Sequence, residues 1–284
     1  MVKTIYKLTL VSLILASLVV ILGAYTRLTD AGLGCPDWPG CYGFLTVPTE
    51  QADVAAAQQA FPERPVEADK AWNEMIHRYF AGSLGLLVLI IFVLSLKSRQ
   101  SMVLPGILLV TICFQALLGM WTVTMNLMPL VVMGHLLGGF TTFCLLVLLA
   151  LNQRRQLAVE VKPVDVGKPV ASKLKMLAAT TLLLVITQIA LGGWTAANYA
   201  AVACVQLPVC EPGWVNKFDL AQALSIPTGY ADYEYGVLTY EARISIHILH
   251  RFGAVLTLLS CLLLSWLLLK QTAISYKKLG LMVA

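Results

Sequence analysis

Six apolar runs, each near the length needed to cross a lipid bilayer, constrain the fold of this chain more than any other feature. They lie at about residues 5–25, 78–96, 102–125, 129–151, 173–196 and 244–269. A bilayer-spanning helix needs roughly 20 such residues, and helical hydrogen bonding satisfies the backbone inside the membrane. With 58% hydrophobic and 12% charged residues, the chain is too apolar for a soluble domain. An all-α, polytopic membrane protein is therefore predicted.

The distribution of charge predicts how these helices are oriented. Lysines and arginines gather in the short connections on one side, whereas the two long connections, 26–77 and 197–243, are mostly acidic. Because basic loops stay on the cytoplasmic side, we expect a cytoplasmic N-terminus and long loops on the outer face of a plasma (inner) membrane. The net charge of +5 then reflects topology in the lipid bilayer, and no nucleic-acid partner is predicted.

Four of the seven cysteines form two equally spaced pairs in the long loops, Cys35 with Cys41 and Cys204 with Cys210. Paired cysteines on the oxidising side of a membrane favour local disulfides. As structural cross-links they would stiffen the outer loops, and as redox groups they would exchange thiols. Exposure and thiol pKa separate the two interpretations, so both stay open at the level of sequence.

A shared motif on the outward-running helices predicts an internal repeat. Residues 19–35, 114–126 and 187–204 align on a Leu-Gly step and on a threonine three residues after that glycine. The first and third stretches are each followed by a cysteine pair, a long loop and a helix with a His-Arg step. We therefore predict two pseudo-symmetric four-helix halves, residues 1–155 and 156–284.

Such a repeat calls for eight helices, with a further histidine on the eighth. Only the start of a seventh run is seen, near Leu279. We therefore expect that the last one to two helices are missing from this chain and that it is a truncated form.

Three histidines lie at one predicted membrane depth. His77 and His135 fall on neighbouring inward-running helices of the first half, and His250 falls on the matching helix of the second half. Ionisable residues inside a membrane are costly and usually functional, and two imidazoles on facing helices can ligate a haem iron from both sides. One such histidine alone is explained as well by a carbonyl or water partner, whereas three at one level favour haem ligation. His247, one turn before His250, is the alternative ligand.

Charged residues beside these histidines suggest further roles. Glu74 precedes His77 by three residues and shares its helix face, where it could accept a proton or pair with Arg78 or a lipid headgroup. Arg78 and Arg251 directly follow histidines. Arginine binds carboxylates in a bidentate manner, so these two could hold haem propionates. The alternative is that they are interfacial side chains that reach the headgroups.

Together, four segments resemble the haem A synthase family of bacteria and mitochondria. They are YTRLTDAGLGCPDWPGCYG, NEMIHRYFAG, GHLLGG and IHILHRFGA, in this order, and the resemblance extends over about residues 15–270. It implies an eight-helix protein in which one half binds the substrate haem O and the other a haem b cofactor. The implied reaction oxidises a ring methyl of haem O to the formyl group of haem A, by successive hydroxylations, for the biogenesis of terminal cytochrome oxidases.

The resemblance also implies roles for single residues. His77 and His135 match histidines of the substrate site, His250 matches a haem b ligand, and Glu74 matches the acidic residue needed for the oxidation. The second haem b ligand would lie on the eighth helix. The cysteine pairs match loop pairs found in some branches of the family. Haem O synthase and cytochrome oxidase assembly factors are implied partners, and the oligomeric state stays open, a homo-oligomer included.

Two other functions compete with this interpretation. A di-haem b membrane electron carrier that takes electrons from quinol would need the same histidines but no substrate site. A membrane thiol–disulfide oxidoreductase would use the four loop cysteines as a relay and would leave the histidines unexplained. The sequence therefore favours an oxidoreductase that acts on haem O, then the cytochrome, then the thiol relay.

Overall fold

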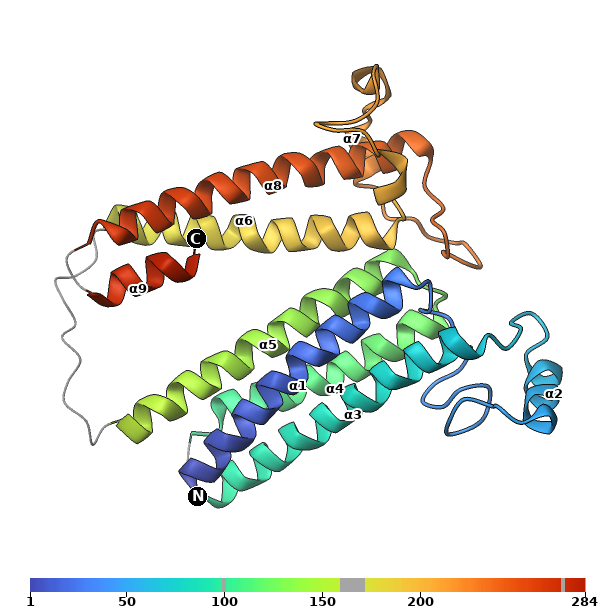
Figure 1. Ribbon diagram of the computed structural model, residues 1–284, viewed down its shortest axis with the longest axis horizontal. Helices are drawn as coiled ribbons and strands as arrows, with labels where there is room; N and C mark the ends of the chain where they lie inside the picture. The colour runs from blue at the N-terminus through green and yellow to red at the C-terminus, as the bar shows by residue number, and fades with distance from the viewer. Residues whose placement is uncertain (99–100, 159–171, 272–273, 284) are drawn as a thin grey trace. The chain divides into compact units, whose positions relative to one another are not determined.

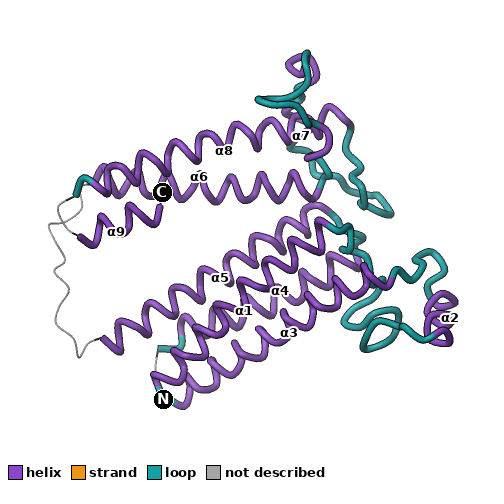
Figure 2. The backbone as a smooth tube through the Cα atoms, viewed as in Figure 1, coloured by secondary structure: helices purple, strands orange, loops and turns teal. Residues whose placement is uncertain are grey.

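The computed structural model describes residues 1–98, 101–158, 172–271 and 274–283, and within these ranges it contains helices and loops but no strand (Figure 2). The predicted all-α fold is confirmed. The α-helices are α1 (Val2–Leu28), α2 (Gln51–Ala60), α3 (Ala68–Lys97), α4 (Val103–Thr124), α5 (Pro129–Ala158), α6 (Ser172–Ala197), α7 (Leu220–Ala223), α8 (Tyr240–Leu269) and α9 (Ile274–Val283).

Among the described residues, six helices are long and apolar enough to cross a membrane, namely α1, α3, α4, α5, α6 and α8. They coincide with the six apolar runs and support a multi-pass membrane protein. The helices α3 and α8 begin earlier than their apolar runs, at Ala68 rather than residue 78 and at Tyr240 rather than residue 244. Their first turns are polar, so hydropathy alone misses them although the helical hydrogen bonds continue.

Two compact units make up the chain, one of Met1–Val161 with Thr228–Glu234 and one of Lys162–Pro227 with Tyr235–Ala284. The first unit is built on a bundle in which α1 and α4 each pack against both α3 and α5 (Figure 1). It follows that α3 and α5 lie diagonally opposite each other. The buried core of the bundle is aliphatic, formed by residues such as Leu84, Val88, Ile91, Leu108 and Leu146.

The second unit is built on the antiparallel pair α6 and α8, with α9 and α7 packed against α8. Leu174, Leu264 and Leu268 form a small apolar cluster in this pair. The short helix α7 is fixed by the Trp194 indole, which donates to the carbonyl of Ala223 at 2.9 Å.

Loops cover the end of the first unit at which α3 begins (Figure 1). Gly34 lies directly on α3, where an added Cβ would come within 2.6 Å of the Lys70 carbonyl oxygen, so a larger residue cannot follow this path. The segment Thr228–Glu234, which follows α6 in sequence, also belongs to this unit. Arg64 holds it by ion pairs to Asp232 at 2.6 Å and Glu234 at 2.9 Å. The predicted division of the chain after residue 155 stays a prediction.

Candidate functional site

His77 and His135 face each other inside the first bundle. They are the tenth residue of α3 and the seventh of α5, and both are half-buried. Their ring centroids are 6.5 Å apart, with the ring planes at 84°. Two imidazoles that ligate one metal from opposite sides, with nitrogen–metal bonds of about 2 Å, have centroids roughly 6–6.5 Å apart. The spacing of this pair therefore fits two-sided ligation of one iron.

A glycine on the preceding outward helix makes room for each of the three histidines. A Cβ added at Gly23 of α1 would lie 3.0 Å from Cε1 of His77, and one at Gly119 of α4 would lie 3.3 Å from Cε1 of His135. Small residues let membrane helices approach closely, and here the space they leave is filled by an imidazole edge. The glycine of each Leu-Gly step in the repeated motif therefore leaves the space that a histidine ring occupies.

The same contact occurs in the second unit, where a Cβ added at Gly192 of α6 would lie 3.1 Å from Cε1 of His250. In all three contacts Cε1 is the ring atom closest to the glycine. We name the three contacts, Gly23–His77, Gly119–His135 and Gly192–His250, the glycine slots.

Glu74 and Arg78 join α3 to the first disulfide loop. The buried Glu74 carboxylate accepts from the backbone N–H of Cys35 at 2.8 Å and from Nη2 of Arg78 at 2.5 Å. Nη1 of Arg78 donates to the carbonyl of Asp37 at 2.9 Å and also to that of Gly40. The two residues therefore form a buried ion pair beside His77 and tie the loop to the same helix.

Arg251 makes equivalent contacts with the second disulfide loop. Its guanidinium donates to the carbonyls of Cys204 at 2.7 Å, Gln206 at 2.5 Å and Val209 at 2.5 Å. Its Nε donates to Nε2 of His247 at 3.3 Å. Both arginines thus hold loop carbonyls, a role that the sequence analysis did not foresee, and their binding to haem propionates stays a prediction.

The alternative ligand His247 precedes His250 by three residues, as Glu74 precedes His77. Its Nε2 accepts from Arg251, so that nitrogen is engaged with the loop anchor. His250 is instead directed to α6, where its Nδ1 is 2.8 Å from Nε2 of Gln188. Of the two, His250 is therefore the one whose ring is oriented by a side chain of the neighbouring spanning helix.

Residues 6–284 match the sequence model of the COX15-CtaA family, described as cytochrome oxidase assembly protein. The chain belongs to this family. It is 49% identical over 278 residues to a protein of Shewanella oneidensis named Heme A synthase, and the alignment covers 96% of this chain and 82% of that relative. The resemblance found in the sequence is thereby confirmed.

More distant members carry the same name. A Heme A synthase of Bacillus pumilus is 28% identical over 215 residues, which cover 71% of this chain and 63% of the relative. One of Bartonella tribocorum is 25% identical over 262 residues, which cover 85% of this chain and 69% of the relative.

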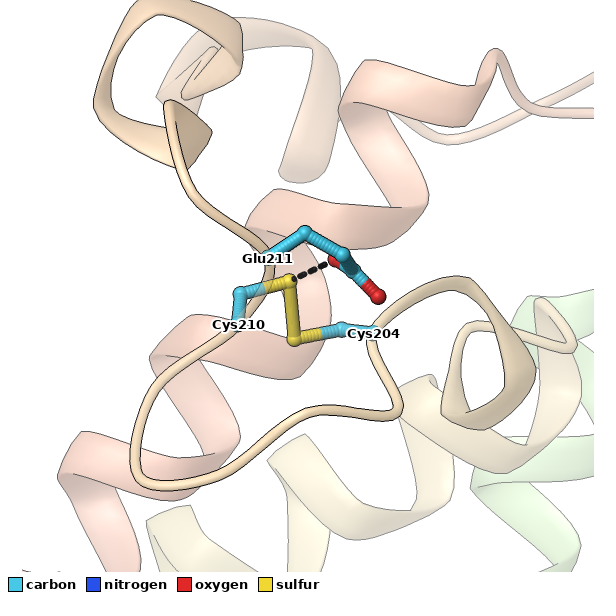
Figure 3. A group of neighbouring side chains, drawn as sticks. All are labelled: Cys204, Cys210 and Glu211. Atoms are coloured by element: carbon cyan, nitrogen blue, oxygen red, sulfur yellow. Dashed lines mark hydrogen bonds between the residues drawn. A yellow bond between two sulfur atoms is a disulfide. The ribbon is translucent and has the colours of Figure 1, made fainter.

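In this COX15-CtaA protein both cysteine pairs are bonded, with sulfur–sulfur distances of 2.03 Å for Cys35–Cys41 and 2.23 Å for Cys204–Cys210. Figure 3 shows the second pair beside Glu211, whose carboxylate lies 2.7 Å from the Cys210 sulfur and accepts from the backbone N–H of Val205 at 3.2 Å. Metals bind thiolates, and disulfide sulfurs are not thiolates. The cluster is therefore a loop cross-link rather than a metal site.

Neither the glycine slots nor the contact of Gln188 with His250 was predicted from the sequence. The aligned Leu-Gly steps were a usable signal for the slots, because each glycine recurs on the helix that precedes a histidine-bearing helix. The signal for Gln188 was weaker. Gln188 stands four residues before Gly192, but Gln115 stands equally far before Gly119, so this spacing alone does not single out Gln188.

Proposed function

We propose that this chain is a haem A synthase, an oxidoreductase that converts a ring methyl of haem O to the formyl group of haem A by successive hydroxylations. The observation that carries the proposal is the facing pair of His77 and His135, whose ring centroids are 6.5 Å apart. Support comes from membership of the COX15-CtaA family and from the 49% identical Heme A synthase.

The first unit is the proposed substrate site. His77 and His135 would bind the iron of haem O from opposite sides, each held from behind by its glycine slot. Because both rings are half-buried on diagonal helices, a planar macrocycle between them would be shielded by apolar side chains. Two fixed ligands would hold the macrocycle between α3 and α5.

Glu74 is the proposed catalytic residue. Its carboxylate is 5% exposed, one helical turn from His77, and is oriented by Cys35 and Arg78. Negative charge held in a buried site favours cationic character that develops nearby during an oxidation, and a carboxylate can accept the proton that is released. The oriented contacts keep Glu74 in place without a reorganisation during the reaction.

The second unit is the proposed site of a haem b cofactor, with His250 as ligand, His247 as the alternative and Arg251 beside them. His250 lies on α8, and its ring is oriented by the Gln188 amide of α6, which lies 2.8 Å from its Nδ1. When bound, haem b would accept or relay the electrons withdrawn from the substrate. His250 would orient it through α8.

We further propose that the protein lies in the plasma (inner) membrane with its N-terminus in the cytoplasm and its loops and haem sites toward the outer side. The basic short connections and acidic long loops support this orientation. Haem O synthase and cytochrome oxidase assembly factors are the proposed partners. The two disulfides cross-link the loops over the histidines, and a redox cycle of either pair would be an additional function.

The test is to express the protein with a haem O synthase in a host that lacks haem A, and to separate the extracted haems by chromatography with mass detection. We expect haem A, or its hydroxymethyl intermediate, from the native chain, and neither from His77→Ala or Glu74→Ala. Glu67→Ala is the matched control, because Glu67 directly precedes α3, and its carboxylate is 55% exposed and pairs with Lys70. Unchanged haem O beside firmly bound haem b would instead indicate an electron carrier.

A further inference from the structure

The first disulfide loop engages both carboxylate oxygens of Glu74. Oε2 accepts directly from the backbone N–H of Cys35 at 2.8 Å, and Oε1 accepts from Nη2 of Arg78 at 2.5 Å. Nη1 of the same guanidinium donates to the carbonyl of Asp37 at 2.9 Å and to that of Gly40. The direction in which the Glu74 carboxylate points therefore depends on where the backbone of this loop lies.

The loop ends in a tight turn that leaves two backbone N–H groups to bond elsewhere. Cys41 and Phe44 exchange backbone hydrogen bonds of 2.8 and 3.1 Å. Between them, Tyr42 and Gly43 have φ angles of 55° and 81°, as the two central residues of a type I′ turn must. A positive φ is uncommon for a tyrosine. Because the turn itself uses neither central N–H group, both can bond an acceptor outside the turn.

The carboxylate of Asp37 is that acceptor. Its Oδ1 accepts from the N–H of Tyr42 at 2.6 Å, and its Oδ2 accepts from the N–H of Gly43 at 2.7 Å. Successive backbone N–H groups form a concave anion site, and hydrogen bonds to a carboxylate are stronger than neutral ones. The backbone carbonyl of Asp37 meanwhile accepts from Arg78. Asp37 therefore links the turn to the guanidinium that holds Glu74.

The second disulfide loop has no such link at the equivalent position. Gln206 takes the place of Asp37, two residues after the first cysteine of the pair. Its carbonyl likewise accepts from an arginine, Arg251, at 2.5 Å, but its side chain is an uncharged amide and the residue is exposed. The guanidinium there donates to the imidazole of His247 at 3.3 Å instead of to a carboxylate. The aspartate thus occurs in the loop that holds Glu74 and is replaced in the other.

We propose that Asp37 is a positioning residue for the oxidation, because its carboxylate fixes the loop carbonyls that hold Arg78, and Arg78 in turn orients Glu74. A charged group that is already oriented acts without a reorganisation during the reaction. None of these hydrogen bonds involves the ring of His77 or of His135, so the loss of the Asp37 carboxylate should slow the oxidation without weakening the binding of haem O. This inference rests on the proposed function, since it takes Glu74 as the catalytic carboxylate.

The experiment compares Asp37→Asn and Asp37→Ala with the native full chain. Asparagine keeps the size of the side chain, but its amide nitrogen cannot accept from a backbone N–H, so one of the two hydrogen bonds is lost. Alanine loses both. In membranes saturated with haem O, we expect the oxidation rate to fall by about 100-fold for Asp37→Ala, because a shift of about 1 Å can cost that factor, and by less for Asp37→Asn. The dissociation constant for haem O, titrated in detergent, should stay that of the native chain.

Amide hydrogen exchange, followed by mass spectrometry, reports the loop independently of activity. The N–H groups of Tyr42 and Gly43 should exchange faster in Asp37→Asn than in the native chain, and fastest in Asp37→Ala. Asp30→Asn is the matched control, because it makes the same chemical change in the same connection, where the carboxylate pairs with Arg27 at 3.2 Å. We expect Asp30→Asn to keep the native rates of oxidation and of exchange in the turn.

Three outcomes would refute the role of Asp37. Native exchange in Asp37→Ala would mean that the carboxylate does not hold the turn. Faster exchange with a native oxidation rate would mean that the turn does not orient Glu74. An equal loss of haem O affinity and of rate would indicate a general structural role. If the native chain itself forms no haem A, the proposed function fails and the role in oxidation fails with it, whereas the exchange data still show whether Asp37 holds the turn.

Discussion

The glycine slots predict that two chemically identical substitutions will have different effects. Alanine at Gly23 places a carbon 3.0 Å from Cε1 of His77, whereas ordinary contact begins at 3.4 Å, so the ring must move by about 0.4 Å. Alanine at Gly119 places it 3.3 Å from His135, which requires a shift of only about 0.1 Å. Distances between a metal and its ligands hold to within about 0.2 Å. Gly23→Ala should therefore disturb ligation, and Gly119→Ala should be tolerated.

The energy follows from two opposing effects. Overpacking a well-filled site costs about 1–3 kcal/mol, and replacing a helical glycine by alanine recovers about 0.5–1 kcal/mol. Gly23→Ala should thus lower the free energy of unfolding by roughly 0–2.5 kcal/mol, which leaves the protein folded enough to assay.

The assay is a haem titration of the purified protein, followed by the absorption spectrum of iron with two imidazole ligands. Gly82→Ala on α3 is the control, because no atom lies within 4 Å of its added Cβ. We expect weaker binding and a partial loss of the two-imidazole spectrum for Gly23→Ala alone. Native binding by Gly23→Ala, or an equal loss in Gly119→Ala, would refute the reasoning.

Three further predictions concern the outer loops of the first unit. Glu74→Gln leaves Arg78 without its buried carboxylate partner and should destabilise the fold by about 3 kcal/mol, seen as a lower Tm in detergent, whereas an unchanged Tm would contradict the pairing. Burial and the nearby carboxylates of Glu67 and Glu74 raise the pKa of Tyr42. Its contribution to the free energy of unfolding is therefore complete below the usual pKa near 10 and is lost as the pH rises through the higher folded pKa. Tyr42→Phe should remove this loss of stability at alkaline pH in a series of unfolding curves followed by fluorescence. Arg64→Ala should cost about 1 kcal/mol at most and less at high salt, and a double-mutant cycle with Glu234→Ala should report a coupling of that size.

The helices could be predicted from sequence because an apolar run of spanning length can satisfy its backbone in a bilayer only as a helix. The residues at which α3 and α8 begin could not be predicted. At Ala68 and Tyr240 the helices begin in polar segments, where hydropathy carries no signal and the helix is defined by backbone hydrogen bonds. The Thr239 side chain, which accepts from the backbone N–H of Ala242 at 3.3 Å, is the cap that a search for helix starts would have found.

The site was predictable to the level of residue type and depth. His77 and His135 could be paired because both were placed at one depth on inward-running helices, and the structure brings their rings together although α3 and α5 are diagonal rather than neighbouring helices. The contacts of Arg78 could not be foreseen, because they depend on how the disulfide loop folds back onto α3. Gln188 could not be distinguished from Gln115 in the sequence, because both stand four residues before a slot glycine and only the structure shows which amide contacts a histidine.

Each glycine slot joins two spanning helices that follow one another in the chain, and this sets an order of events during biosynthesis. Protein chains emerge and fold from the N-terminus, so the α1–α3 hairpin can complete its slot before α4 has been synthesised. At that stage the nascent chain offers a single imidazole, His77. The proposed two-sided ligation would begin only when α5 has been synthesised and brings His135 to face His77. A chain whose synthesis stops before α5 would therefore contain only one histidine of the pair and could not hold a haem between two imidazoles.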